Sequence, residues 1–160
     1  MAHGLIIAET KHGLICANAG VDASNVPGED TVALLPSDPD ASARRIRGEL
    51  AIACEARPGV IVADSFGRPW RLGQVDVALG CAGITALDDW RGRLDREGHE
   101  LTATAIAIAD ELAASADLVR DKTAGVPAVL IAGAGRWVTE EDGEGACPAL
   151  RRAAEDDLFR

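Results

Sequence analysis

Aromatic side chains are scarce in this chain of 160 residues: they make up 3% of it, and tyrosine is absent altogether. Proteins that bind single-stranded nucleic acid stack the bases on aromatic rings, and this sequence offers few such platforms. Basic residues are also in the minority, with 16 Lys and Arg against 26 Asp and Glu and a formal net charge of −10. A surface this acidic repels phosphate backbones and anionic lipid, which argues against nucleic acid and membranes as partners.

Long apolar runs are missing as well. No stretch approaches the roughly 20 residues that a membrane-spanning helix needs, and residues 1–4 lack the basic segment that opens a secretory signal. The cysteines are few and scattered, without a CxxC pair, which favours free thiols over a zinc site or a disulfide framework; they are Cys16, Cys54, Cys81 and Cys147. We therefore expect a cytoplasmic protein.

Short apolar runs bounded by Gly, Pro, Asp and Asn predict several β-strands. Residues 4–9 and 13–18 read as a hairpin in which Gly13 supplies a positive φ. Residues 31–35, 60–63 and 128–132 read as further strands, the last two buried, and residues 75–84 form another apolar stretch. Residues 64–74 are polar and glycine-rich and read as a loop.

Two main helices are predicted between these strands. Asp38 is placed as an N-cap with Pro39 at the first helical position, and the helix ends before residues 58–59. Residues 102–119 carry apolar side chains at helical spacing and form the longest predicted helix, and a short one is expected near residues 150–154. The pattern predicts one α+β domain over residues 1–160, with a mixed β-sheet core and two main helices.

The loop over residues 19–30 is long enough to suggest a functional role. Asp22 and Asn25 offer a carboxylate and a carboxamide three residues apart, and Mg²⁺ and Mn²⁺ prefer such hard oxygen ligands. The same spacing is typical of an Asx turn, in which both side chains bond only local backbone. Spacing alone leaves both interpretations open.

A second group of polar residues follows the predicted strand at residues 60–63. A carboxylate at the end of a buried strand, here Asp64 followed by Ser65, can present its charge rigidly to a ligand in a crevice. The alternative is that Asp64 caps a turn.

Two basic segments complete the candidate residues. Arg68 and Arg71 flank a Pro-Trp pair, and Gln74 follows them. The arginines could hold phosphates or carboxylates, or could pair with surface carboxylates instead. Lys122 and Gly125 lie in a turn after the long predicted helix, where basic residues also favour the helix dipole without binding any ligand.

Taken in order along the chain, these segments resemble the coenzyme F420-0:gamma-glutamyl ligases. The resemblance rests chiefly on HGLICANAGVDASNV at residues 12–26, LLPSDPDASA at 34–43 and DSFGRPWRLGQ at 64–74. Residues 109–113, Lys122 with residues 125–127, and the ending at 155–160 fit the same family. The resemblance covers essentially the whole chain and implies a gamma-glutamyl ligase-like fold.

Members of that family add L-glutamate to coenzyme F420-0 through gamma-linked peptide bonds, using GTP and a divalent cation, Mg²⁺ or Mn²⁺. The resemblance implies that Asp22 and Asp64 hold one metal ion and that Ser65 helps to hold a second. It implies nucleotide contacts from Asn25 and from the segment of Lys122 and Gly125, and an assembly as an intertwined homodimer. Arg68, Arg71 and Gln74 are then candidates for binding the substrate.

This chain departs from the family pattern in two places. Many relatives have Gln or Glu as a metal ligand where this chain has Lys122, and an ammonium group cannot ligate Mg²⁺. Family members also carry an N-terminal portion with phosphate contacts, so we expect this chain to be the C-terminal and larger part of the ligase domain. The expected activity is weak, metal-dependent GTP binding with low turnover. The alternatives are a non-catalytic protein that binds metal and deazaflavin, and a structural fragment of the ligase.

Overall fold

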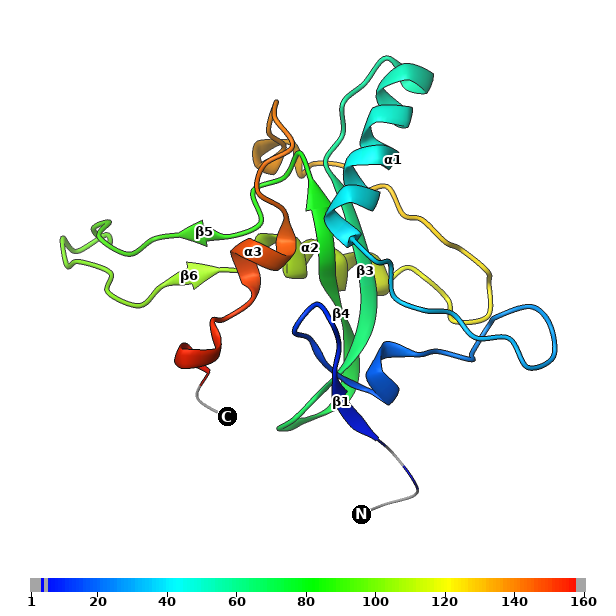
Figure 1. The fold of residues 1–160 in the computed structure, drawn as a ribbon. Helices are drawn as coiled ribbons and strands as arrows, with labels where there is room; N and C mark the ends of the chain where they lie inside the picture. The colour runs from blue at the N-terminus through cyan, green and yellow to red at the C-terminus, as the bar shows by residue number, and fades with distance from the viewer. Residues whose placement is uncertain (1–3, 5, 158–160) are drawn as a thin grey trace.

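The computed structural model describes residues 4 and 6–157, apart from the side chain of Cys147. Helices and strands are both present, as the predicted α+β class requires (Figure 1). The helices are α1 (Pro39–Cys54), α2 (Ile108–Asp117) and α3 (Ala146–Leu150), with 3-10 turns η1 (Asn18–Gly20), η2 (Gly135–Trp137) and η3 (Ala154–Asp156). The strands are β1 (Ile7–Glu9), β2 (Ile15–Ala17), β3 (Val60–Arg68), β4 (Arg71–Ala82), β5 (Asp88–Asp89) and β6 (Ala105–Ile106).

The strands pair as three antiparallel ribbons in the described residues, β1 with β2, β3 with β4 and β5 with β6. The predicted mixed β-sheet core is therefore wrong for the described residues, where the strands of each ribbon pair antiparallel. The predicted N-terminal hairpin is confirmed: Gly13 has a φ of +78° in its turn, and the Gly13 amide donates to the Thr10 carbonyl over 2.9 Å. Residue 5 of its first predicted strand lies outside the described residues.

The β3–β4 hairpin runs through the middle of the fold, and the β5–β6 hairpin extends away from it (Figure 1). The strand predicted at residues 60–63 is confirmed, but it is only half-buried and continues to Arg68, so the predicted loop at residues 64–74 is wrong. Residues 64–67 continue the strand because each pairs with β4, Asp64 opposite Val77 and Ser65 opposite Asp76. The chain reverses within two residues between β3 and β4.

Helix α1 begins as predicted, because the Asp38 carboxylate accepts a hydrogen bond of 2.8 Å from the Ala41 amide and Pro39 occupies the first turn. Of the apolar side chains of α1, Ala43 is buried, but Leu50 is 36% exposed. Arg47 is buried instead, with an exposure of 1%. Its guanidinium donates to the Asp142 carboxylate and to two backbone carbonyls, so the buried charge is paired.

The first turn of α1 lies directly against β4. One oxygen of the buried Asp40 carboxylate accepts hydrogen bonds of 2.8 Å from the amides of Cys81 and Ala146. The contact requires glycine at position 80, because a Cβ there would lie 2.3 Å from the Pro39 carbonyl carbon. Asp40 therefore joins α1, β4 and α3.

Helix α2 packs on the same hairpin through Ile108, Ala109 and Ala113, which are buried. The helix predicted over residues 102–119 begins only at Ile108, as α2, because residues 105–106 pair with β5. At 16 residues α1 is longer than the 10-residue α2. The main core cluster lies between α2, the end of β4 and α3, and consists of Cys81, Ile84, Ala86, Ala109 and Ala146.

Three further predictions need correction. Residues 31–35 contribute only an isolated bridge, in which Ala33 pairs with Asp22. Residues 128–132 form no strand in the described structure, and Leu130 is 88% exposed, because no partner strand lies beside this segment. The helix expected near residues 150–154 is formed earlier, as α3.

Two cysteines agree with the expected thiols, since Cys16 is buried and free and Cys54 is exposed and free. Outside the described residues lie the side chain of Cys147 and residues 1–3 and 158–160. Residues 158–160 are the end of the segment 155–160 that contributes to the family resemblance. Among the described residues, no helix combines the length and apolar character that crossing a membrane requires.

The close approach of α1 to β4 generates a stability prediction. Gly80→Ala should lower the free energy of unfolding by about 1–3 kcal/mol or more, because the new Cβ meets backbone that cannot move aside. Gly67→Ala is the matched control: it lies in the same hairpin, and a Cβ there meets nothing within 4 Å. Urea unfolding followed by circular dichroism measures both. Equal stability of the two variants would contradict the close contact.

Candidate functional site

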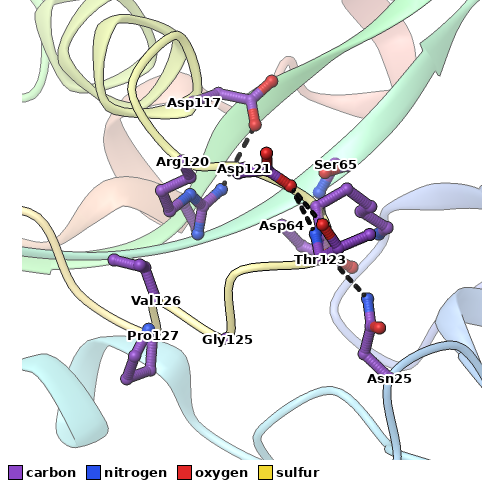
Figure 2. Close-up of a pocket in the computed structure, with 12 residues that line it drawn as sticks. Asn25, Asp64, Ser65, Asp117, Arg120, Asp121, Thr123, Gly125, Val126 and Pro127 are labelled. Carbon is purple, nitrogen blue, oxygen red and sulfur yellow. Dashed lines mark hydrogen bonds and ion pairs between the residues drawn. The ribbon is translucent and has the colours of Figure 1, made fainter.

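A cavity of about 570 Å³ opens between β3, the C-terminal end of α2 and the segment that follows it. It brings together five of the nine predicted site residues, from three separate parts of the chain (Figure 2). These are Asn25, Asp64, Ser65, Lys122 and Gly125. The cavity is therefore the candidate functional site.

Asp64 lies within β3 rather than at the strand end where the sequence analysis placed it. Its carboxylate accepts a hydrogen bond of 2.9 Å from the Ser65 amide. Partial burial raises the pKa of Asp64 above its ordinary value, and the neighbouring carboxylates of Asp22 and Asp76 raise it further. The Ser65 amide and the Lys122 ammonium act against these effects. Asp64 is thus a partly desolvated carboxylate that faces other negative charges.

Asp22 is exposed and forms the Asx turn that its sequence allows. One carboxylate oxygen accepts the Ser24 amide and the other accepts the Ser24 hydroxyl, each over 2.8 Å. The hydrogen bond from the Ser24 amide is the main reason why the pKa of Asp22 lies below its ordinary value. Asp22 does not line the cavity, yet its charge acts on Asp64.

Asn25 connects the long N-terminal loop to the far side of the cavity. Its Nδ2 donates a hydrogen bond of 3.1 Å to the Lys122 carbonyl, across 97 residues of sequence. The ammonium of Lys122 favours the charged forms of both Asp22 and Asp64. Gly125 adopts a φ of +64°, which glycine accepts without strain.

The remaining three predicted residues, Arg68, Arg71 and Gln74, lie at the exposed tip of the β3–β4 hairpin and do not line this cavity. Arg68 donates to the carbonyls of Leu72 and Gly73 and so closes the tip. Their role in binding substrate stays a prediction.

Two residues outside the predicted site set act at the cavity: Arg120 lines it, and Asp76 contacts Ser65 and Arg120. Asp76 is only 1% exposed. Its carboxylate accepts a hydrogen bond of 2.7 Å from the Ser65 hydroxyl and forms an ion pair with Arg120. Arg120 also lies 3.6 Å from Asp117 at the end of α2 (Figure 2). A lone Asp between two valines in an apolar strand was the available signal, because a buried charge needs a partner.

The cavity is thus lined by the carboxylates of Asp64, Asp117 and Asp121 and by the cationic side chains of Lys122 and Arg120. The charges of Asp22 and Asp76, outside the lining, also act on Asp64. In the part of the chain that the structure describes, no group of three or more His, Cys, Asp or Glu side chains could hold a metal ion on its own. A lining of both signs fits a ligand that is an anion together with a bound cation better than it fits an anion alone or a cation alone.

Comparison with known proteins shows a match to the family described as F420-0:Gamma-glutamyl ligase over residues 1–133. The chain is 47% identical over 156 residues to a coenzyme F420:L-glutamate ligase of Methanocaldococcus jannaschii, covering 97% of this chain and 60% of that protein. Proteins of the same name from Haloarcula marismortui and Methanothermobacter thermautotrophicus are 52% identical over 127 residues and 46% over 162.

The Haloarcula alignment covers 79% of this chain and 49% of that relative, and the Methanothermobacter alignment covers 100% and 63%. The chain therefore spans about half to three-fifths of the length of these curated relatives.

The raised pKa of Asp64 predicts how stability depends on pH. A carboxyl group with a higher pKa in the folded state binds more protons when folded, so ionisation costs stability as the pH rises from the unfolded to the folded pKa. In EDTA at pH 7, Asp64→Asn should therefore unfold at a higher temperature than the parent. Glu29→Gln, an exposed loop change with the same loss of charge, is the control. Calorimetric melting that shows Asp64→Asn to be the less stable protein would contradict this.

Proposed function

The chain belongs to the F420-0:gamma-glutamyl ligase family, and we propose that it adds L-glutamate by gamma-linkage to coenzyme F420-0, using GTP and a divalent cation. The observation that carries the proposal is the convergence of Asn25, Asp64, Ser65 and Lys122 on one cavity. Three segments far apart in sequence supply these residues.

The first component of the proposal is a Mg²⁺ or Mn²⁺ ion held by Asp64 and Asp22, with Ser65 helping to hold a second. Asp64 is partly desolvated and faces other carboxylates, and a bound cation would relieve that repulsion. Both carboxylates offer the hard oxygen ligands that these ions prefer. The protein supplies only part of a coordination shell, which suits Mg²⁺, because this ion commonly keeps waters and takes one or two carboxylates plus substrate phosphates.

The second component is the nucleotide. Phosphate oxygens of GTP crowd negative charge together, and the cation would neutralise part of it. The ammonium of Lys122 supplies a further positive charge on the same cavity. Asn25 holds the Lys122 segment in place through its hydrogen bond to the Lys122 carbonyl. We propose that Asn25, Lys122 and Gly125 bind and orient the nucleotide.

The proposed chemistry explains why a nucleotide is required. A carboxylate is a poor electrophile, so the carboxylate of F420-0 first takes the γ-phosphoryl group of GTP, which releases GDP. The amine of L-glutamate then attacks the acyl carbon, the amide bond forms, and inorganic phosphate leaves. Positioning and neutralisation of charge supply most of the rate enhancement in phosphoryl transfer, and these are the tasks that the cavity residues can perform.

A second function, binding of metal and deazaflavin without turnover, is favoured by one observation. Lys122 places a fixed positive charge near Asp22 and Asp64, and an ammonium group donates hydrogen bonds but cannot ligate a cation.

The homodimer expected from the resemblance stays a prediction. Large exposed side chains that could support such a contact are Ile52, Leu72 and Leu130, at 86%, 97% and 88% exposure.

The proposed cation site predicts binding of Mn²⁺ that depends on Asp64. Titration calorimetry should detect Mn²⁺ binding to the parent, and Asp64→Asn should largely abolish it, because the neutral amide loses the ionic ligand. Asp117→Asn removes a carboxylate that lines the same cavity and should bind Mn²⁺ nearly as the parent does. Parent-like binding by Asp64→Asn would make this carboxylate structural.

The ligase proposal predicts GDP release that requires F420-0, L-glutamate and Mn²⁺ together. Mass spectrometry of the mixture should show F420-0 extended by one glutamyl residue, and Asp64→Asn should form neither product. Omitting glutamate separates ligation from simple hydrolysis of GTP. Metal-dependent binding of GTP without any extended product would select the non-catalytic alternative.

A further inference from the structure

We propose that Asp76 and Arg120 are positioning residues that orient the Ser65 hydroxyl so that its oxygen accepts, rather than donates, toward the cavity. The inference rests on the proposed cation site, and it gives a function to two residues outside the predicted site set: Arg120, which lines the cavity, and Asp76, which contacts Ser65.

The hydrogen bond from Ser65 to Asp76 determines where the hydroxyl proton points. Ser65 and Asp76 are direct partners across the β3–β4 hairpin, and the Ser65 Oγ lies 2.7 Å from Asp76 Oδ1. A serine hydroxyl has one proton and two lone pairs. Because the proton points to Asp76, the lone pairs remain for any group in the cavity, and a cation needs such lone pairs.

Arg120 keeps this arrangement from reversing. Its guanidinium pairs with Asp76 Oδ2, and Arg has only donors, so both oxygens of the carboxylate act as acceptors. Arg120 follows the end of α2, where Asp117 lies 3.6 Å away. The pair therefore also couples the β3–β4 hairpin to the segment that carries Lys122 and Gly125.

Stability alone gives little reason for this pair. Replacing a buried ion pair by apolar side chains of similar volume is often neutral or even stabilising, so a buried pair is weak support for the fold. Asp76 stands between Val75 and Val77 in an otherwise apolar part of β4, where a third apolar residue would fit the pattern. Orientation of the adjacent Ser65 gives the charge a function.

The variant Asp76→Asn should reverse the polarity of the hydrogen bond with little change of shape. Arg120 can only donate, so the new carboxamide would turn its oxygen to Arg120 and its Nδ2 to Ser65. The hydroxyl would then accept from Asn and direct its own proton elsewhere, including toward the cavity. Loss of an outer-shell partner typically weakens metal binding by about 10–100-fold, and we expect a loss of that size for Mn²⁺.

A double-mutant cycle tests the inference with Mn²⁺ alone as the probe. Mn²⁺ affinity is measured by electron paramagnetic resonance of the free ion for the parent, Ser65→Ala, Asp76→Asn and the double variant, each checked for folding by thermal melting. Both single variants should bind more weakly, and the double variant should bind no more weakly than Ser65→Ala, because Asp76 acts through the hydroxyl. Additive losses, or parent-like binding by either single variant, would overturn the inference.

Asp117→Asn is the matched control, because it removes a carboxylate beside Arg120 that does not contact Ser65 in the structure. A loss equal to that of Asp76→Asn would mean that only charge matters, and would overturn the inference. If Asp76→Asn does not fold, Arg120→Lys replaces it in the cycle, since a single flexible ammonium fixes the carboxylate less firmly than a planar guanidinium. Its smaller loss should disappear in the Ser65→Ala background, and an undiminished loss there would contradict the proposal.

The outcomes separate this inference from the proposed function. A parent that binds no Mn²⁺ would overturn the cation site and the inference together. Binding that Asp64→Asn abolishes but Asp76→Asn leaves unchanged would overturn only the positioning role.

Discussion

The buried carboxylate of Asp40 is the contact on which the rest of the arrangement depends. It accepts amides from β4 and from the start of α3 while belonging to the first turn of α1, so three elements meet at one oxygen atom. Such a close meeting is possible only because residues 80 and 145 are glycines, whose missing Cβ atoms leave room for Pro39 and Asp40. With β4 held in this way, antiparallel pairing fixes β3, and therefore the positions of Asp64 and Ser65.

Two cationic side chains line the cavity, although the chain as a whole carries a surplus of 10 negative charges. Positive groups come from one short segment after α2, which contains both Arg120 and Lys122. Arg120 neutralises the buried Asp76, while Lys122 acts on Asp22 and Asp64. A net charge taken from composition would have excluded anionic ligands too readily, because a local cluster of two cations can receive phosphate on an acidic protein.

Local sequence signals predicted local structure well. The N-cap at Asp38 and the turn at Gly13 are encoded by neighbouring residues, and both are confirmed. Properties that depend on distant partners were missed, because a pattern within one segment does not contain them. The polar residues after Asp64 resemble a loop until β4 provides a partner strand, and Arg47 resembles a surface residue until Asp142, 95 residues later, pairs with it.

At the candidate site, the two interpretations of Asp22, as an Asx turn and as a ligand for a cation, are compatible. Asp22 forms an Asx turn, yet each of its oxygens accepts only one hydrogen bond from Ser24 and retains lone-pair capacity. The turn therefore holds the carboxylate in one orientation without occupying all of its acceptor sites. Ser65 follows the same logic, because its proton is directed to Asp76 and its lone pairs are left over. In both cases a neighbouring side chain fixes the geometry of an oxygen without using up its capacity to accept, which is the property that a cation or a phosphate-bound water requires.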